Sequence, residues 1–114
     1  MSALSERHCA RIVKGDPALP AAEARALQGQ LHTDWQLDAG SKAIHREFRF
    51  KDYYETLAFV NAVAWIAHRE DHHPDLDVAY NRCRVRYSTH AVGGLSENDF
   101  ICAARVDALI LQAD

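Results

Sequence analysis

Three histidines lie within the stretch HREDHHPDLDVAY, which spans residues 68–80. They are His68, His72 and His73, and a fourth, His90, follows further along the chain. Imidazole has an unperturbed pKa of about 6.5, so it can give or take a proton at neutral pH. Two or three such rings in one cleft could therefore act as acid and base at opposite ends of one substrate.

A metal site is the first alternative to proton transfer. If a helix runs to His72, then His68 and His72 lie four residues apart on one side of it, as in half of a zinc site. The residues between them are Arg-Glu-Asp, so the HExxH arrangement of zinc proteases is absent. The adjacent His72 and His73 also point in different directions, and we therefore expect no metal.

A purely structural role is the second alternative. Histidines near the end of a helix can be solvated groups that interact favourably with the negative end of the helix dipole. We favour this interpretation for His68. For the other rings, Asp71 or Asp75 could supply an orienting carboxylate.

The composition is that of a single small globular domain. The chain has 114 residues, 48% of them hydrophobic and 25% charged, which argues against a disordered protein. Its formal charge of −3 argues against nucleic-acid binding, and no apolar run is long enough to span a bilayer. The first residues lack the apolar core of a signal peptide, so the expected location is the cytoplasm. The three cysteines form no CxxC pair and are interpreted as free thiols: Cys9, Cys83 and Cys102.

The first half of the chain predicts an arm, a helix and a β-hairpin. Residues 1–18 are expected to form a flexible arm, so that residues 19–114 make up the domain. A helix is predicted over 20–31, where helix-forming residues follow a proline. A hairpin is predicted over 32–50, with its turn at 39–42. The alternating apolar residues of the hairpin are Trp35, Leu37, Ile44, Phe48 and Phe50.

The second half predicts a helix, a strand and a helix. Residues 52–71 have a wide apolar face suited to covering a sheet, and Pro74 ends that helix. Residues 76–90 alternate like one half-buried strand bent near Asn81, and a final helix is predicted over 96–111. The central stripe of the long helix would be Tyr53, Leu57, Val60, Ala64 and Ala67, flanked by Phe59, Val63 and Ile66. The order α-β-β-α-β-α implies an α+β domain with an antiparallel β-sheet and helices packed on one face.

The sequence also predicts two helix caps and has one charged residue at an apolar position of the hairpin. Asp52 and Ser96 are the expected N-caps, with Glu55 and Asp99 three residues later in each case. Arg46 interrupts the apolar face of the hairpin, and we expect it near a sheet edge or against a partner chain.

The histidine stretch also resembles the signature of the pterin-4a-carbinolamine dehydratase family, which includes the dimerisation cofactor of a homeodomain transcription factor. That signature has a charged residue, then His-His-Pro, an aromatic residue, a further His and a later Asp. The matching residues are His68, His72, His73, Pro74, Tyr80, His90 and Asp99. Trp35 and the segments FRFKDYYETLAFVNAVAWIAH and STHAVGGLSENDF follow the family pattern as well, so the resemblance covers residues from about 20 to 111.

The resemblance implies a lyase, more narrowly a hydro-lyase acting on 4a-hydroxytetrahydrobiopterin or a related pterin. The enzyme would dehydrate the 4a-hydroxytetrahydropterin to quinonoid dihydropterin, with no metal and no organic cofactor. This reaction recycles the tetrahydrobiopterin that aromatic amino acid hydroxylases use, so a hydroxylase would be its pathway partner. The family fold agrees with the α+β order predicted above.

The resemblance also assigns roles to residues. His72 and His90 would be the acid–base pair, and His73 would complete the catalytic set mainly as a pterin-binding group. Pro74 would fix the turn that presents the histidines. Asp99 would orient His90 or cap the last helix.

One position departs from the common pattern of the family. Many members carry a glutamate where this chain has His68, and that acid is thought to support the catalytic histidines. His68 is therefore expected to be a supporting residue. The presence of histidine in place of glutamate would alter the pH optimum or the stereochemical preference of the enzyme rather than its reaction class. Trp35 and Tyr80 are interpreted as core aromatics.

A non-catalytic binding protein on the same fold is the competing hypothesis. Some bacterial relatives are assembly chaperones for the carbon-fixing carboxylase, and the mammalian members are transcriptional coactivators. The chaperone relatives usually lack the histidine motif, so its presence here favours catalysis. Self-association into a homodimer or homotetramer is also expected, because one strand face carries arginines and helices cover only one side of the sheet.

Overall fold

The computed structural model describes residues 3–112, which form three α-helices, four strands and three short 3-10 helices. In chain order these are η1 (Leu4–Glu6), α1 (Ala21–Gln28), β1 (Gln36–Leu37), η2 (Ala39–Ser41), β2 (Ile44–Arg49), α2 (Tyr53–Glu70), β3 (Asp75–Val78), β4 (Arg82–Tyr87), η3 (His90–Val92) and α3 (Glu97–Gln112). Within this part of the chain, no helix combines the length and the apolar character needed to cross a membrane.

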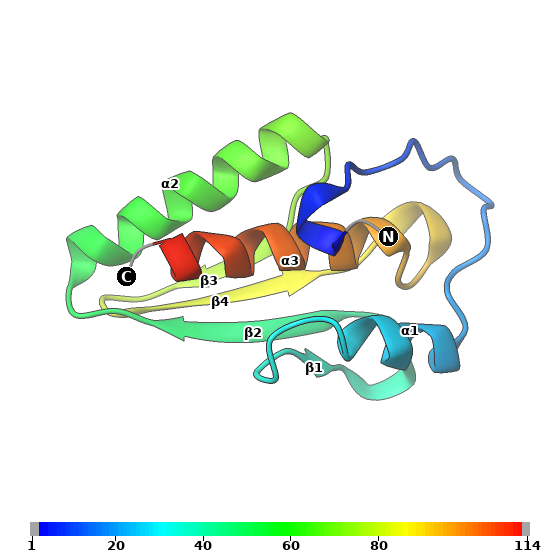
Figure 1. The fold of residues 1–114 in the computed structure, drawn as a ribbon, viewed down its shortest axis with the longest axis horizontal. Helices are drawn as coiled ribbons and strands as arrows, with labels where there is room; N and C mark the ends of the chain where they lie inside the picture. The colour runs from blue at the N-terminus through cyan, green and yellow to red at the C-terminus, as the bar shows by residue number, and fades with distance from the viewer. Residues whose placement is uncertain (1–2, 113–114) are drawn as a thin grey trace.

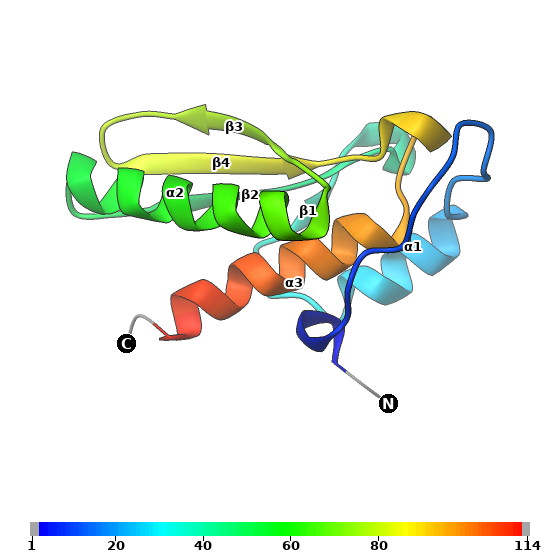
Figure 2. The ribbon, with the colours of Figure 1, turned by 90° about the horizontal axis from the view of Figure 1, so that it is seen from above.

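The four strands form one antiparallel sheet in the order β1-β2-β4-β3. β2 and β4 pair along their whole lengths, from Ile44 opposite Tyr87 to Arg49 opposite Arg82. α2 and α3 lie on one face of the sheet (Figures 1 and 2). The strand residues buried beneath them are Ile44, Phe48, Cys83, Val85 and Tyr87. The predicted α+β fold, with an antiparallel sheet and helices on one face, is confirmed.

The segment after Pro74 contains two strands where the alternation indicated one. β3 and β4 are joined by a turn at residues 79–81, where the Ala79 N–H donates to the Arg82 carbonyl at 2.9 Å. The turn contains neither glycine nor proline, so its composition does not interrupt the alternating pattern. Tyr80 lies in this turn and is 63% exposed, so the expectation of a core aromatic is wrong for Tyr80. Trp35, by contrast, is buried as expected.

α2 covers the sheet with a neighbouring stripe rather than the predicted one. The helix begins as expected, because the Asp52 carboxylate accepts the Glu55 backbone N–H at 2.8 Å. Its buried side chains are Thr56, Phe59 and Val63, whereas Tyr53 is 45% exposed. Phe59 packs on Phe48 of β2, with 4.6 Å between the ring centroids. The apolar face of α2 is wide, so periodicity alone did not determine which of its residues would lie against the sheet.

Arg46 is paired within its own chain. It lies in β2 just beyond the two residues that pair with β1, which is near a sheet edge, as one of the two alternatives predicted. Its Nη1 donates to Asp107 Oδ1 of α3 at 2.7 Å, and its guanidinium carbon lies 4.3 Å from the centroid of the Phe48 ring. The indole N–H of Trp35 donates to the same Asp107 oxygen at 2.8 Å. One carboxylate therefore joins β2 and the residue before β1 to α3.

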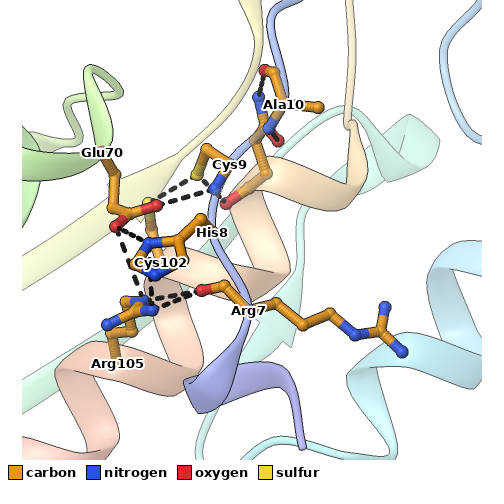
Figure 3. Close-up of polar contacts among 8 residues, drawn as sticks. Arg7, His8, Cys9, Ala10, Glu70, Cys102 and Arg105 are labelled. Atoms are coloured by element: carbon orange, nitrogen blue, oxygen red, sulfur yellow. Dashed lines mark hydrogen bonds and ion pairs between the residues drawn. The ribbon is translucent and has the colours of Figure 1, made fainter. Parts of the chain in front are cut away.

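The described part of the N-terminal arm, residues 3–18, runs along α3 toward η3 (Figure 2). η1 packs against α3, and Gly15 donates its N–H to the Ala91 carbonyl at 3.4 Å. Side chains of α2 and α3 hold the arm's backbone at Arg7, Cys9 and Ala10 (Figure 3). These contacts are Arg105 Nε to the Arg7 carbonyl at 2.9 Å, the Cys9 N–H to Glu70 Oε1 at 2.7 Å, and the Ala10 N–H to Asn98 Oδ1 at 2.9 Å. The division into a flexible arm and a domain at residue 18 stays a prediction.

Glu70 is the charged anchor of the arm. Its side chain is 4% exposed, and His8 Nδ1 lies 2.9 Å from its second carboxylate oxygen. Burial by itself raises the pKa of Glu70, but the N–H of Cys9, His8 and the nearby Arg105 outweigh burial and hold that pKa below its ordinary value. Docking of the arm therefore depends on an ionised Glu70.

Asp107→Ala is expected to lower the free energy of unfolding by about 3 kcal/mol, because Arg46 and Trp35 would lose their shared acceptor in a mostly buried site. Urea denaturation measures the change. The matched control is Glu47→Ala, which removes an exposed ion pair with Arg82 and should cost less than about 1 kcal/mol. Equal losses in the two variants would contradict the special role of Asp107.

Glu70→Gln is expected to lower the free energy of unfolding by about 1.5 kcal/mol at neutral pH, the scale of a hydrogen bond to a charged group. Because the pKa of Glu70 is lower in the folded protein than in the unfolded chain, its stabilising effect is fully present above pH 4.5 and is lost as the pH falls through the lowered pKa. Unfolding curves of the two proteins should thus converge in acid. A difference that grows toward low pH would contradict this assignment.

Candidate functional site

His72 is held by contacts on two sides. α2 ends at Glu70, and Asp71 then takes a left-handed conformation (φ 51°, ψ 45°) that turns the chain toward the sheet. The His72 ring stacks on Tyr87, with 5.9 Å between centroids and 11° between planes. Its Nε2 lies 2.6 Å from Oδ1 of Asp99, which is fully buried. A charge-assisted hydrogen bond of this kind fixes both the position and the orientation of the ring.

Two more donors converge on the other oxygen of Asp99. The Thr89 hydroxyl donates to Oδ2 at 2.8 Å, and the Ser96 backbone N–H donates to it at 2.9 Å. Thr89 gives its one hydroxyl proton to Asp99, so the Ser96 hydroxyl, 2.6 Å away, is the donor to Thr89. Because the ionised Asp99 carboxylate can only accept hydrogen bonds, we assign the ring proton of His72 to Nε2. Nδ1 is then the ring nitrogen that can accept a proton.

Asp99 therefore combines two roles, but with a different histidine from the one expected. Oδ2 accepts the Ser96 N–H, which is half of the predicted capping box at the start of α3. Oδ1 binds His72, and the hydrogen bonds of residues 3–112 include none between Asp99 and His90. The expected orientation of His90 by Asp99 is thus wrong. Sequence spacing could not decide between two histidines that both come near the start of α3.

His73 and His90 are exposed and line the same cleft as His72. His73 follows His72 directly, and Pro74 then leads the chain into β3. His90 begins η3, just beyond the end of β4. The antiparallel hairpin of β3 and β4 is what brings these segments together, since it returns the chain to the end of α2.

His68 lies apart from the other three histidines. Its ring is 5.4 Å from that of Trp65 on an exposed part of α2, and it does not line the cleft. Because Asp71 breaks the helix, His68 and His72 do not share a helix face, and the half zinc site considered above does not form. Among residues 3–112, no hydrogen bond or ion pair links His68 to His72.

The cleft has a volume of about 1030 Å³. One wall is the end of α2 with the turn after it, and a second is the end of β4 with η3. Residues 9–12 of the arm form a third wall, beside Asn98 of α3. Charged side chains of both signs line it, namely Arg11, Glu70, Asp71, Asp75 and Arg86.

Arg86 is fixed at the cleft by acidic neighbours. Its Nε donates to Asp38 Oδ2 at 3.0 Å, and its Nη1 lies 3.7 Å from Asp75 Oδ2. Burial raises the pKa of Asp38, but hydrogen bonds from Arg86 and His45 outweigh burial, so that pKa lies below its ordinary value. An ionised Asp38 thus holds the guanidinium in place.

The histidines and carboxylates of this cleft can transfer protons and form hydrogen bonds. Within residues 3–112, no three His, Cys, Asp or Glu side chains are grouped so that they could hold a metal ion. The expectation that the protein works without a metal stays a prediction.

Several residues of the site were not predicted from the sequence. Thr89 adjoins His90 and Asn98 adjoins Asp99 in the sequence. Their positions next to motif residues were the one signal that could have identified them. Residues 9–12 carry no periodicity or motif that would place them at the cleft.

Comparisons with known proteins agree with this architecture. A family profile described as "Pterin 4 alpha carbinolamine dehydratase" matches residues 17–109. A protein of Nitrosomonas eutropha is 57% identical over 95% of this chain and 94% of its own length, and one of Legionella pneumophila is 50% identical over 96% and 97%. Both carry the provisional name pterin-4-alpha-carbinolamine dehydratase.

Two solved structures are similar as well. A transcriptional coactivator/pterin dehydratase from Brucella melitensis superposes with a TM-score of 0.76 at 35% identity, covering 81% of this chain and 97% of that one. A pterin dehydratase-like protein described as a RuBisCO assembly factor in the alpha-carboxysome has a TM-score of 0.59 at 25% identity, covering 68% and 90%. From its match over residues 17–109 and its close relatives, the chain belongs to the pterin-4-alpha-carbinolamine dehydratase family.

Proposed function

We propose that this protein dehydrates a 4a-hydroxytetrahydropterin to quinonoid dihydropterin by histidine acid–base catalysis. The observation that carries the proposal is the His72–Asp99 pair, 2.6 Å apart, in a cleft that His73 and His90 also line. Membership of the dehydratase family supports the reaction class. The pterin would then return to aromatic amino acid hydroxylases.

The proposed reaction needs an acid and a base that act at different atoms. The C4a–O bond breaks as the hydroxyl takes a proton and leaves as water, while N5 loses its proton and a C4a=N5 double bond forms. His72 suits the base, because Asp99 holds Nε2–H and leaves Nδ1 as the proton acceptor. His90 enters the cleft from η3 and is the proposed acid for the leaving hydroxyl.

His73 and Pro74 have proposed roles in presenting the substrate. His73 lines the cleft and is exposed, so its ring can bind the pterin without first breaking an internal contact with Asp99. Pro74 does not line the cleft, and its proposed role is to set the direction of the chain between His73 and β3.

A binding role on the same fold is the second candidate. The similar structures include a protein titled as a coactivator/dehydratase and one titled as an assembly factor. Trp65 and Tyr54 of α2 are 60% and 80% exposed, and neither lines the cleft. A binding surface and a catalytic cleft could therefore coexist on this chain.

We also propose that the protein is cytoplasmic and acts as a homodimer or homotetramer. The sheet face opposite α2 and α3 carries alternating charges, such as Glu47, Arg84 and Arg86, which offer a polar surface for a second copy. Gel filtration at micromolar concentration tests this proposal, and a monomer would contradict it.

His72→Gln and His90→Ala are each expected to lower the dehydration rate by about 10²- to 10⁴-fold, because each removes one proton-transfer group. The assay generates the 4a-carbinolamine with a phenylalanine hydroxylase and follows quinonoid dihydropterin. The glutamine amide can still donate to Asp99, which helps His72→Gln to fold.

His68→Ala is the matched control and should keep wild-type activity, since His68 lies outside the cleft. Treatment of this protein with a chelator, which is removed before the hydroxylase is added, should leave the rate unchanged. If the folded wild-type protein gives no acceleration, the dehydratase proposal fails and the binding role becomes the working hypothesis.

Asp99→Asn is expected to lower kcat by about 10²-fold with a smaller change in KM, because the His72 ring would lose the partner that fixes its tautomer. Nitrogen-15 NMR of the imidazole should show the proton on Nε2 in the wild type and a tautomer mixture in the variant. Ser96→Ala removes a hydroxyl from the same network but leaves the His72 contact, so it should change neither readout by more than a few fold. An unchanged His72 tautomer in Asp99→Asn would refute the positioning role.

A further inference from the structure

Two thiols from distant parts of the chain meet beside the cleft. Cys9 of the arm and Cys102 of α3 are 93 residues apart in sequence, yet their sulfur atoms lie 3.4 Å from one another (Figure 3). Cys9 also lines the cleft, whereas Cys102 is fully buried beneath it. Neither thiol has a part in the proposed dehydration.

The approach of the two sulfurs is imposed by the backbone around Cys9. The Cys9 N–H is bound to Glu70, and the next residue, Ala10, is held at both its N–H and its carbonyl by the Asn98 side chain. These contacts do not involve either sulfur. Closing an S–S bond therefore requires a shift of side chains and not a relocation of the arm.

The three cysteines differ in their access to an oxidant. Cys9 is half-buried at the cleft and can meet a small solute. The hydrogen bond with Cys9, together with burial, raises the pKa of Cys102, so Cys102 is not the thiol that reacts first. Burial also raises the pKa of Cys83, in β4, to about 11, which makes Cys83 an inert internal reference.

We propose that Cys9 and Cys102 are an oxidisable dithiol, which a peroxide converts into a disulfide that fastens the arm to α3 at the wall of the cleft. The proposal goes beyond pterin dehydration and does not depend on it.

The chemistry balances in two steps. The Cys9 thiolate attacks one peroxide oxygen, the O–O bond breaks, and Cys9 becomes a sulfenic acid while the other oxygen leaves as water after taking the thiol proton. Cys102 sulfur then attacks the Cys9 sulfur, and the sulfenic oxygen leaves as a second water. In sum, two thiols and one peroxide give one disulfide and two waters, with two electrons passing from sulfur to peroxide.

The bond would act on the arm rather than on the histidines. In the reduced protein, only non-covalent contacts hold residues 7–10 against α2 and α3, namely hydrogen bonds, the ion pairs of Arg7 and His8 and the packing of Cys9. Such a segment can open locally. A covalent link between positions 9 and 102 lowers the conformational entropy of the opened and unfolded states. The third wall of the cleft would then be fixed.

The test treats the full-length reduced protein with hydrogen peroxide and maps its peptides by mass spectrometry without reduction. The expected product is one linked Cys9–Cys102 peptide pair, two hydrogens lighter than the sum of its parts. Cys83→Ser should form it equally well, whereas Cys9→Ser and Cys102→Ser should not form it. A monomer in which Cys9 is oxidised to sulfinic acid while Cys102 stays a thiol would overturn the proposal, as would a bond between Cys9 residues of two chains.

A second measurement checks that the bond forms in the folded state. The oxidised protein should unfold about 5 °C or more above the reduced one, and its Cys9 and Ala10 amides should exchange hydrogen at least several-fold more slowly. An unchanged Tm and unchanged exchange would show that the bond does not fasten the arm. Dehydration is assayed separately, so an inactive protein that still forms the disulfide would refute the proposed function alone.

Discussion

The buried carboxylate of Asp99 is the constraint on which the other contacts of the site depend. It collects one donor from the turn after α2 (His72), one from beyond β4 (Thr89) and one from the start of α3 (Ser96). A fully buried carboxylate is costly unless its oxygens accept hydrogen bonds, so these three segments must keep their relative positions. The contacts that stabilise the fold at this point are thus the same ones that orient the proposed base.

α3 is the element through which the rest of the molecule is joined. Asp99 near its start meets the site, Asn98 and Arg105 hold the backbone of the arm, and Asp107 binds Arg46 and Trp35. Most of these polar contacts are partly or fully shielded from water, where a lost partner costs more than at the surface. An apolar stripe alone would let α3 slide or rotate on the sheet, whereas these polar contacts fix its register.

The arm is a structural part of the cleft. The family profile begins at residue 17, but residues 9–12 form a wall of the cleft and Cys9 brings a thiol to Cys102. Its anchor, Glu70, is the last residue of α2, two positions before His72. The arm is therefore close enough to the site that a substitution in it can affect the site while every histidine is kept.

The sequence by itself determined the fold class, the ends of α2 and the capping residue at position 52, because caps, prolines and periodicity act within a few residues of the chain. The histidines were expected in one cleft from the family resemblance, and only the tertiary structure brings His72, His73 and His90 to that cleft. It did not determine that residues 75–87 form two strands, because the turn at 79–81 keeps the alternating pattern. Nor did it determine which histidine binds Asp99, that Arg46 pairs with Asp107, or that the arm reaches the cleft. Each of these depends on groups 27 to 93 residues apart. Only the tertiary structure decides such pairings, because the burial that makes them favourable exists only once the helices cover the sheet.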